Sequence, residues 1–226
     1  STLFPYTTLF RSVKFEGGGL AITEPETSGS AIAKEMQSYY EYIDENTIHL
    51  KSSKYWQGNS QSDFLLVAAK EKKDGRLSKT ISLIFVPKEY IEYDVLKSEG
   101  LKAVRYAVNK IDASIPSKYL IKLSDSKANS LREFQNIFIR SRLQLIGMTH
   151  GIMEYILKNI KKYSKNEIKF VEWEIKEIEK RYEASKIMYD YTCNNISPDK
   201  SVSDKLMEAN IIKSLSTDYT YEAART

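Results

Sequence analysis

The chain has 226 residues, of which 42% are hydrophobic and 28% are charged, so it is long enough to form one large globular domain or two small ones. Its net charge of +4 comes from 34 basic and 30 acidic residues interleaved along the chain, which argues against a nucleic-acid-binding protein. No apolar run is long enough to span a membrane, and the single cysteine, Cys193, cannot form an internal disulfide, which fits a reducing, cytoplasmic location.

The two ends of the chain differ in character from the rest. The stretch from Leu3 to Ser12 resembles the translation of a common DNA-sequencing adapter, so we interpret residues 1–12 as an artefact rather than as a genuine apolar arm. The last residues, up to Thr226, stop inside a helical pattern without a capping residue. We therefore expect an internal fragment of a longer protein.

Residues 13–126 carry the signals of a β-rich domain. Apolar or alternating runs bounded by turn residues predict strands at residues 20–23, 38–43, 47–50, 64–69, 79–86 and 104–111. Asp74 and Gly75 predict a hairpin turn, and residues 31–37 predict a short helical turn. Several short strands joined by turns are typical of a mostly antiparallel barrel or sandwich.

After Ser130 the hydrophobic spacing changes to three and four residues, which predicts three long helices. The first covers residues 131–160, the second residues 168–189, and the third runs from about Asp204 to the end. Gly147 and Gly151 would allow another element to approach the first helix closely. The predicted fold class is α+β: a mostly antiparallel β-barrel in residues 13–126, then an antiparallel bundle of long α-helices, truncated at its end, in residues 127–226.

Two stretches of the β-rich part have the composition of ligand-binding loops. The segment from Leu20 to Ser30 contains Thr-Glu-Pro-Glu and then Thr, Ser and Gly, and Pro25 has no N–H with which to continue a strand. Its hydroxyls and backbone N–H groups are available to a ligand, although composition alone also fits an ordinary turn. Lys54-Tyr55-Trp56-Gln57-Gly58 precedes an apolar run from Phe64, and taken alone it fits a core Trp beside a turn.

Together these two stretches resemble the flavin-contacting loops of the acyl-CoA dehydrogenases, and the order of a β-domain followed by long helices is similar too. The form Lys-aromatic-Trp-x-Gly looks closer to the acyl-CoA oxidase branch. The resemblance implies an oxidoreductase of fatty acid metabolism that uses FAD to dehydrogenate an acyl-CoA thioester between its α and β carbons. The implied cofactor-binding residues are Ile22, Thr23, Gly29, Ser30, Tyr55, Trp56 and Gly58, and the implied substrate-binding residues are Ser30 and Arg142.

The resemblance also implies a mechanism, for which this chain lacks one part. In the family a carboxylate removes the α-proton while the β-hydride moves to flavin N5. Ser141 stands where one branch carries that carboxylate, and in the other branch it lies downstream of Thr226, so the catalytic base is not assigned. One extra residue before Gly29 leaves the assignment of Ser30 uncertain by one position, and the family's FAD-contacting Arg is missing from residues 161–166. We expect this polypeptide alone to bind FAD poorly and to be inactive.

The resemblance further implies partners and leaves alternatives. The electron acceptor would be an electron-transfer flavoprotein or oxygen, and the oligomer a homodimer or homotetramer. His49 and His150 have no partners at ligand spacing, so no metal site is predicted. The alternatives are an acyl-CoA oxidase or a flavin monooxygenase of the same fold, and a non-enzymatic interaction module made of a β-sandwich and a helical bundle.

Overall fold

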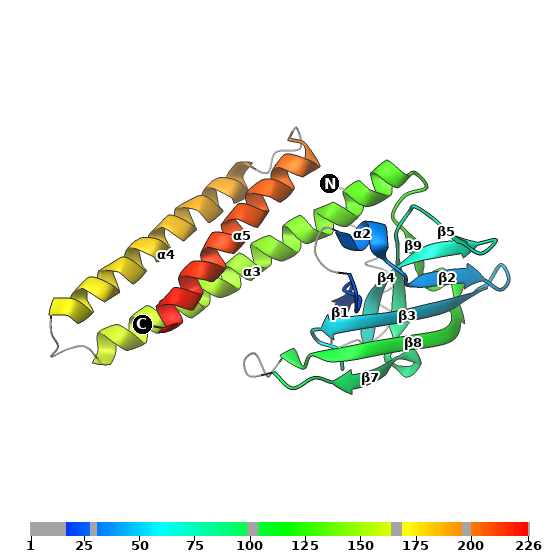
Figure 1. Ribbon diagram of the computed structural model, residues 1–226, viewed down its shortest axis with the longest axis horizontal. Coiled ribbons are helices and arrows are strands. Elements are labelled where there is room, and N and C mark those ends of the chain that lie inside the picture. The colour runs from blue at the N-terminus through cyan, green and yellow to red at the C-terminus, as the bar shows by residue number, and fades with distance from the viewer. Residues whose placement is uncertain (1–16, 28–30, 99–103, 164–168, 196–199, 226) are drawn as a thin grey trace. The chain divides into compact units, whose positions relative to one another are not determined.

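The computed structural model describes residues 17–27, 31–98, 104–163, 169–195 and 200–225 (Figure 1). The adapter-like residues 1–12 lie outside the described residues, and so do Gly29 and Ser30. The chain divides into two compact units, one ending at Glu133 and the other beginning at Phe134.

The first unit contains nine strands in its described part. They are β1 (Gly18–Ala21), β2 (Tyr39–Tyr42), β3 (Thr47–Gln57), β4 (Phe64–Lys73), β5 (Arg76–Leu77), β6 (Ser82–Pro87), β7 (Glu92–Val95), β8 (Ala107–Pro116) and β9 (Leu120–Lys122). The short helical segments are α2 (Ile32–Glu35), η2 (Lys88–Tyr90) and η4 (Ser117–Tyr119). Strands β5, β7 and β9 were not predicted, because each has four residues or fewer.

Strand β4 connects the two halves of the sheet. The strand order is β7-β8-β3-β2-β4-β6-β9, with β1 and β5 also paired to β4. The first residues of β4 pair with β1 and β6, and its later residues pair with β2 and β5. The pairs β1–β4 and β2–β4 are parallel and the others are antiparallel, so the prediction of a mostly antiparallel sheet is confirmed.

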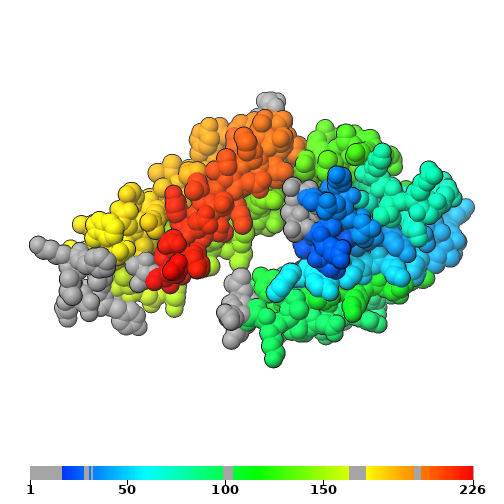
Figure 2. Space-filling model, in the orientation of Figure 1, coloured from blue at the N-terminus to red at the C-terminus, as the bar shows by residue number. Residues whose placement is uncertain are grey.

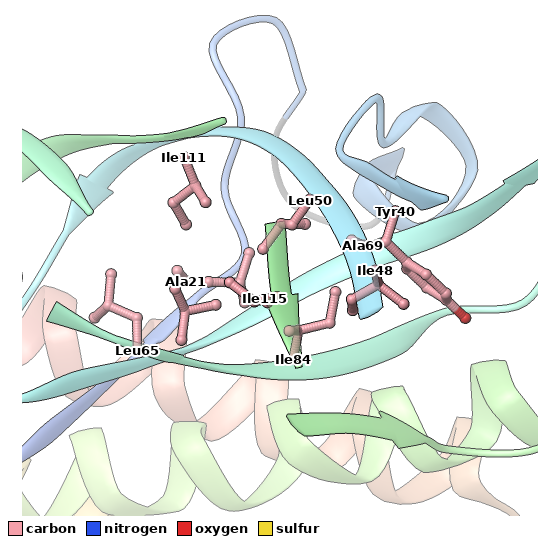
Figure 3. Close-up of a cluster of buried hydrophobic side chains, with 11 residues drawn as sticks. Ala21, Tyr40, Ile48, Leu50, Leu65, Ala69, Ile84, Ile111 and Ile115 are labelled. Carbon is pink, nitrogen blue, oxygen red and sulfur yellow. The ribbon is translucent and has the colours of Figure 1, made fainter. Parts of the chain in front are cut away.

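The core of the first unit lies between these two halves (Figure 3). Alternate residues of the long strands point into it, as the period of two predicts. Burying large aliphatic side chains in this way stabilises each by roughly 1.5–3 kcal/mol. The buried members are Ala21, Tyr40, Ile48, Leu50, Leu65, Val67, Ala69, Ile84, Val86, Ile111 and Ile115.

Three details differ from the predictions. The sheet is open rather than a closed barrel, since no described pairing joins β7 to β9, and all four residues of β7 are exposed. The start of β8 is buried on both faces, since Ala107, Val108 and Asn109 are all buried, instead of alternating between buried and exposed residues. The hairpin at Asp74-Gly75 is confirmed, with both residues at positive φ as a type I′ turn requires, but it leads into β5 rather than directly into β6.

The second unit holds three long helices, as predicted. They are α3 (Lys127–Tyr163), whose first turns belong to the first unit, α4 (Lys169–Asn195) and α5 (Val202–Arg225). Figures 1 and 2 show α4 and α5 side by side along their length, and they run in opposite directions. Their shared core with α3 includes Met153, Leu157, Ile178, Tyr182 and Ala223.

Helix α3 is anchored to the sheet at its start and has two glycines in its middle. At its start, the buried Ser130 hydroxyl bonds both backbone groups of Ile81, donating to the carbonyl at 3.0 Å and accepting from the N–H at 2.7 Å. Gly147 and Gly151 were expected to allow a close approach by another element. No described residue makes such an approach, since a Cβ atom added at either position meets no described atom within 4 Å.

Candidate functional site

The segment after β1 forms one side of the candidate site, which we call the first wall (Ile22–Thr27). The strand ladder stops at Ala21, and Pro25 and Glu26 occupy the middle of a turn in which the Thr27 N–H donates to the Glu24 carbonyl at 3.3 Å. Proline favours the second position of such a turn because its φ is already fixed. Gly29 and Ser30, which were also predicted to belong to this site, lie outside the described residues.

The end of β3 forms the second wall (Lys54–Gly58). The register of β3 against β8 is irregular between Lys54 and Gln57, and Trp56 adopts a φ of 53° at this bulge. A left-handed conformation is costly for a bulky residue and is often found at functional sites. The consequence here is an indole that is 60% exposed, with its ring edge-on to Tyr106 at a centroid distance of 6.5 Å.

The two walls contact each other through the backbone. The Tyr55 N–H donates to the Thr23 carbonyl at 2.9 Å. A Cβ atom added to Gly19 would lie 3.0 Å from the Gly58 carbonyl oxygen, and one added to Gly58 would lie 2.9 Å from Val104. Glycine at 19 therefore permits the close approach of β1 to the second wall, and glycine at 58 leaves room for Val104. Of the sequence-predicted residues, Thr23 and Tyr55 are in direct contact, and Ile22, Trp56 and Gly58 lie within three residues of them in the chain.

Sequence reasoning missed a buried ion pair that links the two walls. Lys54 Nζ lies 2.8 Å from Glu24 Oε1, and the two side chains are 0% and 4% exposed. The same ammonium donates to the Ile22 carbonyl at 3.1 Å. Glu24 also accepts from two backbone N–H groups, that of Gln37 at 2.6 Å and that of Ser38 at 3.0 Å. The carboxylate thereby fixes the first wall to the start of β2.

Burial and pairing oppose each other in this ion pair. Burial alone would raise the pKa of Glu24, but the charge of Lys54 and the hydrogen bond from Gln37 outweigh it and hold the pKa below its ordinary value of 4.5. Burial lowers the pKa of Lys54 from 10.5 to about 8, against the attraction of Glu24. Both groups are therefore charged at neutral pH, and Glu24 is a poor proton acceptor.

A cleft of about 800 Å³ lies next to the turn of the first wall. Its lining residues come from that turn, from β2, β3, β7 and β8, and from η2. Carboxylates outnumber ammonium groups in the lining, which disfavours a polyanionic ligand there. The charged lining residues are Glu24, Glu26, Glu89, Glu92, Asp112, Lys51 and Lys110.

Arg142, the predicted substrate-binding residue, belongs to the second unit. Its guanidinium lies over the Phe138 ring at 5.0 Å from the centroid, and its Nη1 has no hydrogen-bond partner among the described residues. Burial lowers the pKa of this guanidinium. An orphaned, half-buried donor is suited to an acceptor group on a ligand, so the prediction that Arg142 binds substrate stays open.

Within the described residues, no group of three or more His, Cys, Asp or Glu side chains is arranged to hold a metal ion. His49 instead bonds Asp112 at 3.0 Å on the sheet surface. Among the described helices, none combines the length and apolar character that crossing a membrane requires.

The residues of the two walls fit a flat heteroaromatic group. Trp56 presents an exposed aromatic surface, and the apolar side chains of Leu65 and Val104 fill the space beside Gly19 and Gly58. Apolar surface with a few backbone polar groups is the usual lining of a cofactor pocket. The carbonyls of Ile22 and Thr23 are already used by Lys54 and Tyr55, so the Thr23 hydroxyl is the group on this part of the wall that is suited to orienting such a ring.

Comparison with solved structures identifies the fold. A probable acyl-CoA dehydrogenase from Mycobacterium abscessus superposes with a TM-score of 0.75 at 16% identity, and butyryl-CoA dehydrogenase from Megasphaera elsdenii with 0.75 at 17%. The match to each covers 92% of this chain but only 57% of the other protein. An acyl-CoA dehydrogenase from Bacillus anthracis, solved in complex with FAD, superposes with a TM-score of 0.69 at 20% identity over 91% of this chain and 38% of its own.

No family model and no curated protein sequence matches the chain. The structural similarity therefore shows that these residues adopt the fold of the corresponding part of an acyl-CoA dehydrogenase, an open mixed sheet followed by long helices.

Proposed function

We propose that this protein is an acyl-CoA dehydrogenase-like flavoenzyme that catalyses the FAD-dependent α,β-dehydrogenation of an acyl-CoA thioester. The observation that carries the proposal is the direct hydrogen bond between the two predicted flavin-contacting loops, from the Tyr55 N–H to the Thr23 carbonyl, within this fold. Two segments that are 30 residues apart and were assigned to one site by motif alone thus form adjacent walls.

The chain's own residues would bind and orient the cofactor. Trp56 would cover one side of the ring system and exclude water, and the Thr23 hydroxyl would fix its orientation. FAD, when bound, supplies a two-electron acceptor. Gly29 and Ser30 remain proposed cofactor contacts, and Ser30 and Arg142 proposed substrate contacts.

The described residues suggest no general base near these walls. Glu24 is the only carboxylate more than nine-tenths buried among them, but Lys54, Gln37 and Ser38 occupy its oxygens and its pKa is lowered. A useful base needs a raised pKa and access to the substrate proton. We therefore propose that the carboxylate that removes the α-proton lies outside these 226 residues, and we expect no turnover by this polypeptide alone.

The remaining proposals follow the same reasoning. The electron acceptor is an electron-transfer flavoprotein or oxygen, the protein acts in the cytoplasm, and the helical unit supports a homodimer or homotetramer. The sequence from Lys54 to Gly58 favours oxygen as acceptor, and so makes an acyl-CoA oxidase the second candidate.

The test is expression from the complete gene. We expect a yellow protein whose flavin absorbance is bleached by an acyl-CoA under anaerobic conditions. Rapid recovery in air with formation of peroxide would identify an oxidase, whereas slow recovery would identify a dehydrogenase. A colourless protein that takes up no FAD would contradict the proposal and favour the non-enzymatic interaction module. Dehydrogenation by the 226-residue polypeptide itself would contradict the placement of the base.

A further inference from the structure

The buried ammonium of Lys54 holds together parts of the chain that the strand ladder leaves unconnected. β1 pairs with β4, not with β3, and its ladder ends at Ala21. Beyond that point the two walls are joined by the backbone bond from Tyr55 to Thr23 and by the side chain of Lys54, which contacts both the Ile22 carbonyl and Glu24. Lys54 thus occupies the gap between the first wall and β3.

We propose that Lys54 is a positioning residue that, with Glu24, clamps the two walls of the flavin site in their cofactor-binding geometry. The identity of the cofactor rests on the proposed function. The contacts of Lys54 that form the clamp do not depend on which cofactor binds. No catalytic role is implied, since Lys54 is fully buried and cannot touch substrate.

Energetics favour positioning over stabilisation as the reason for a charged pair at this point. Removing two charges from water costs several kcal/mol each, so a buried ion pair is weak support for stability compared with apolar residues of similar size. What an apolar residue cannot provide is direction: the ammonium fixes one carbonyl and one carboxylate oxygen at 3.1 and 2.8 Å. Lys54 precedes Trp56 by two residues, so this fixed point lies beside the bulge that exposes the indole.

Few other charged groups influence the pair. Lys70 of β4 interacts electrostatically with Glu24, and its ammonium donates to the Lys34 carbonyl at 2.9 Å. Asn109 of β8, the register partner of Lys54, is uncharged, fully buried, and has both amide atoms without a hydrogen-bond partner among the described residues. Loss of the Lys54 proton would therefore leave Lys70 as the interacting cation of Glu24 among the described residues.

Trp56 provides a direct reporter of the clamp, because the chain contains only two tryptophans, Trp56 and Trp173. The experiment uses the 226-residue chain with Trp173→Phe. Acrylamide quenching of Trp56 fluorescence is compared between the protein that retains Lys54 and the one that also carries Lys54→Met. The matched control is Lys72→Met, which removes an ion pair of the same 2.8 Å length on the half-exposed surface between β2 and β4. We expect a clear change in quenching for Lys54→Met and none for Lys72→Met.

The pH profile separates a clamp from a merely structural lysine. Because burial holds the pKa of Lys54 at about 8, we expect the Trp56 signal of the wild type to titrate near that pH and the titration to be absent in Lys54→Met. A wild-type titration that is unchanged in Lys54→Met would overturn the proposal.

The cofactor arm uses the protein from the complete gene. We expect Lys54→Met to raise the dissociation constant of FAD about tenfold or more, which is the size of one lost charged hydrogen bond, while Lys72→Met leaves it unchanged. If Lys54→Met does not fold, the uncharged pair Lys54→Met with Glu24→Gln removes the unpaired buried carboxylate and is tested in its place. Wild-type FAD affinity and Trp56 quenching in a folded variant would overturn the clamp. A wild type that binds no FAD would instead contradict the proposed function, and the Trp56 measurements would still decide the clamp.

Discussion

Each of the two units contains a cluster of buried polar side chains, and the clusters around Lys54 and Ser185 differ in charge. In the first unit this cluster is the ion pair of Glu24 and Lys54. In the second it is an uncharged chain in which His150 Nε2 lies 2.8 Å from Ser185 Oγ, and Ser185 Oγ lies 2.6 Å from Ser216 Oγ. These two hydrogen bonds connect α3 to α4 and α4 to α5.

The difference follows from what each group has to hold. The helices satisfy their backbone groups internally, so hydroxyls and a neutral imidazole suffice to fix how they pack. The walls of the first unit leave the sheet and have carbonyls with no ladder partner, such as that of Ile22. A charged donor is the stronger choice there, because hydrogen bonds to ionised groups are roughly twice as strong as neutral ones. Charge is thus buried where regular structure ends.

The largest expected effect is on the stability of the first unit. Glu24→Ala leaves the buried ammonium of Lys54 without its partner, which costs about 3–5 kcal/mol. Urea unfolding followed by Trp56 fluorescence in the Trp173→Phe background measures this loss. Lys72→Met is the control, and it should have a far smaller effect because that pair is half-exposed. Equal losses in the two variants would show that burial of the first pair is energetically unimportant.

The second expected effect is on the helical unit. Ser185→Ala removes the hydroxyl between His150 and Ser216 and leaves two half-buried or buried polar atoms unpaired, at a cost of about 1–3 kcal/mol. Unfolding followed by Trp173 fluorescence in a Trp56→Phe background reports on this unit. Ser214→Ala, on the exposed side of α5, should change little. An unchanged free energy of unfolding in Ser185→Ala would show that the hydrogen bonds among His150, Ser185 and Ser216 do not stabilise the helical unit.

The smallest expected effect is a pH dependence that separates the units. Burial lowers the pKa of His150, against Asp190 and Glu154 and together with Lys186. The folded state then binds fewer protons than the unfolded state, so the helical unit loses stability as the pH falls below 6.5. Glu24 has a pKa below 4.5, so its contribution to the first unit is lost only at more acidic pH. The free energy of unfolding should therefore differ between pH 7.5 and pH 5.5 when it is followed by Trp173 fluorescence, and should hardly differ when it is followed by Trp56 fluorescence. His150→Gln should abolish the difference seen with Trp173.

Much of the fold was predictable because it depends on local patterns. Three- and four-residue spacing located the three helices, and the turn at Asp74-Gly75 has its own signature. The open edge of the sheet was not predictable, because β7 is a short, fully exposed strand with no apolar pattern. Burial of the polar Asn109 was not predictable either, because its neighbour in the register, Lys54, is a charged residue that is itself buried.

The candidate site was predicted in part. Motif similarity singled out Thr23 and Trp56, which lie in the two contacting walls. The pairing of Glu24 with Lys54 was missed, since both residues look like ordinary surface charges and are 30 residues apart in the sequence. The visible signal was their place in the motifs themselves, directly after Thr23 and directly before Tyr55. A charged residue inside a ligand-loop motif is thus a candidate for burial.

The most direct test of the central claim, that these two walls bind flavin, is an FAD titration of the 226-residue chain. In the Trp173→Phe variant, FAD should quench Trp56 fluorescence with a saturable curve, even if the affinity is weak. The Trp56→Phe variant, which retains Trp173, corrects for light absorbed by FAD and should show no saturable quenching. Saturable quenching of Trp173 alone, or of neither tryptophan even at FAD concentrations far above those that load the protein from the complete gene, would contradict the account.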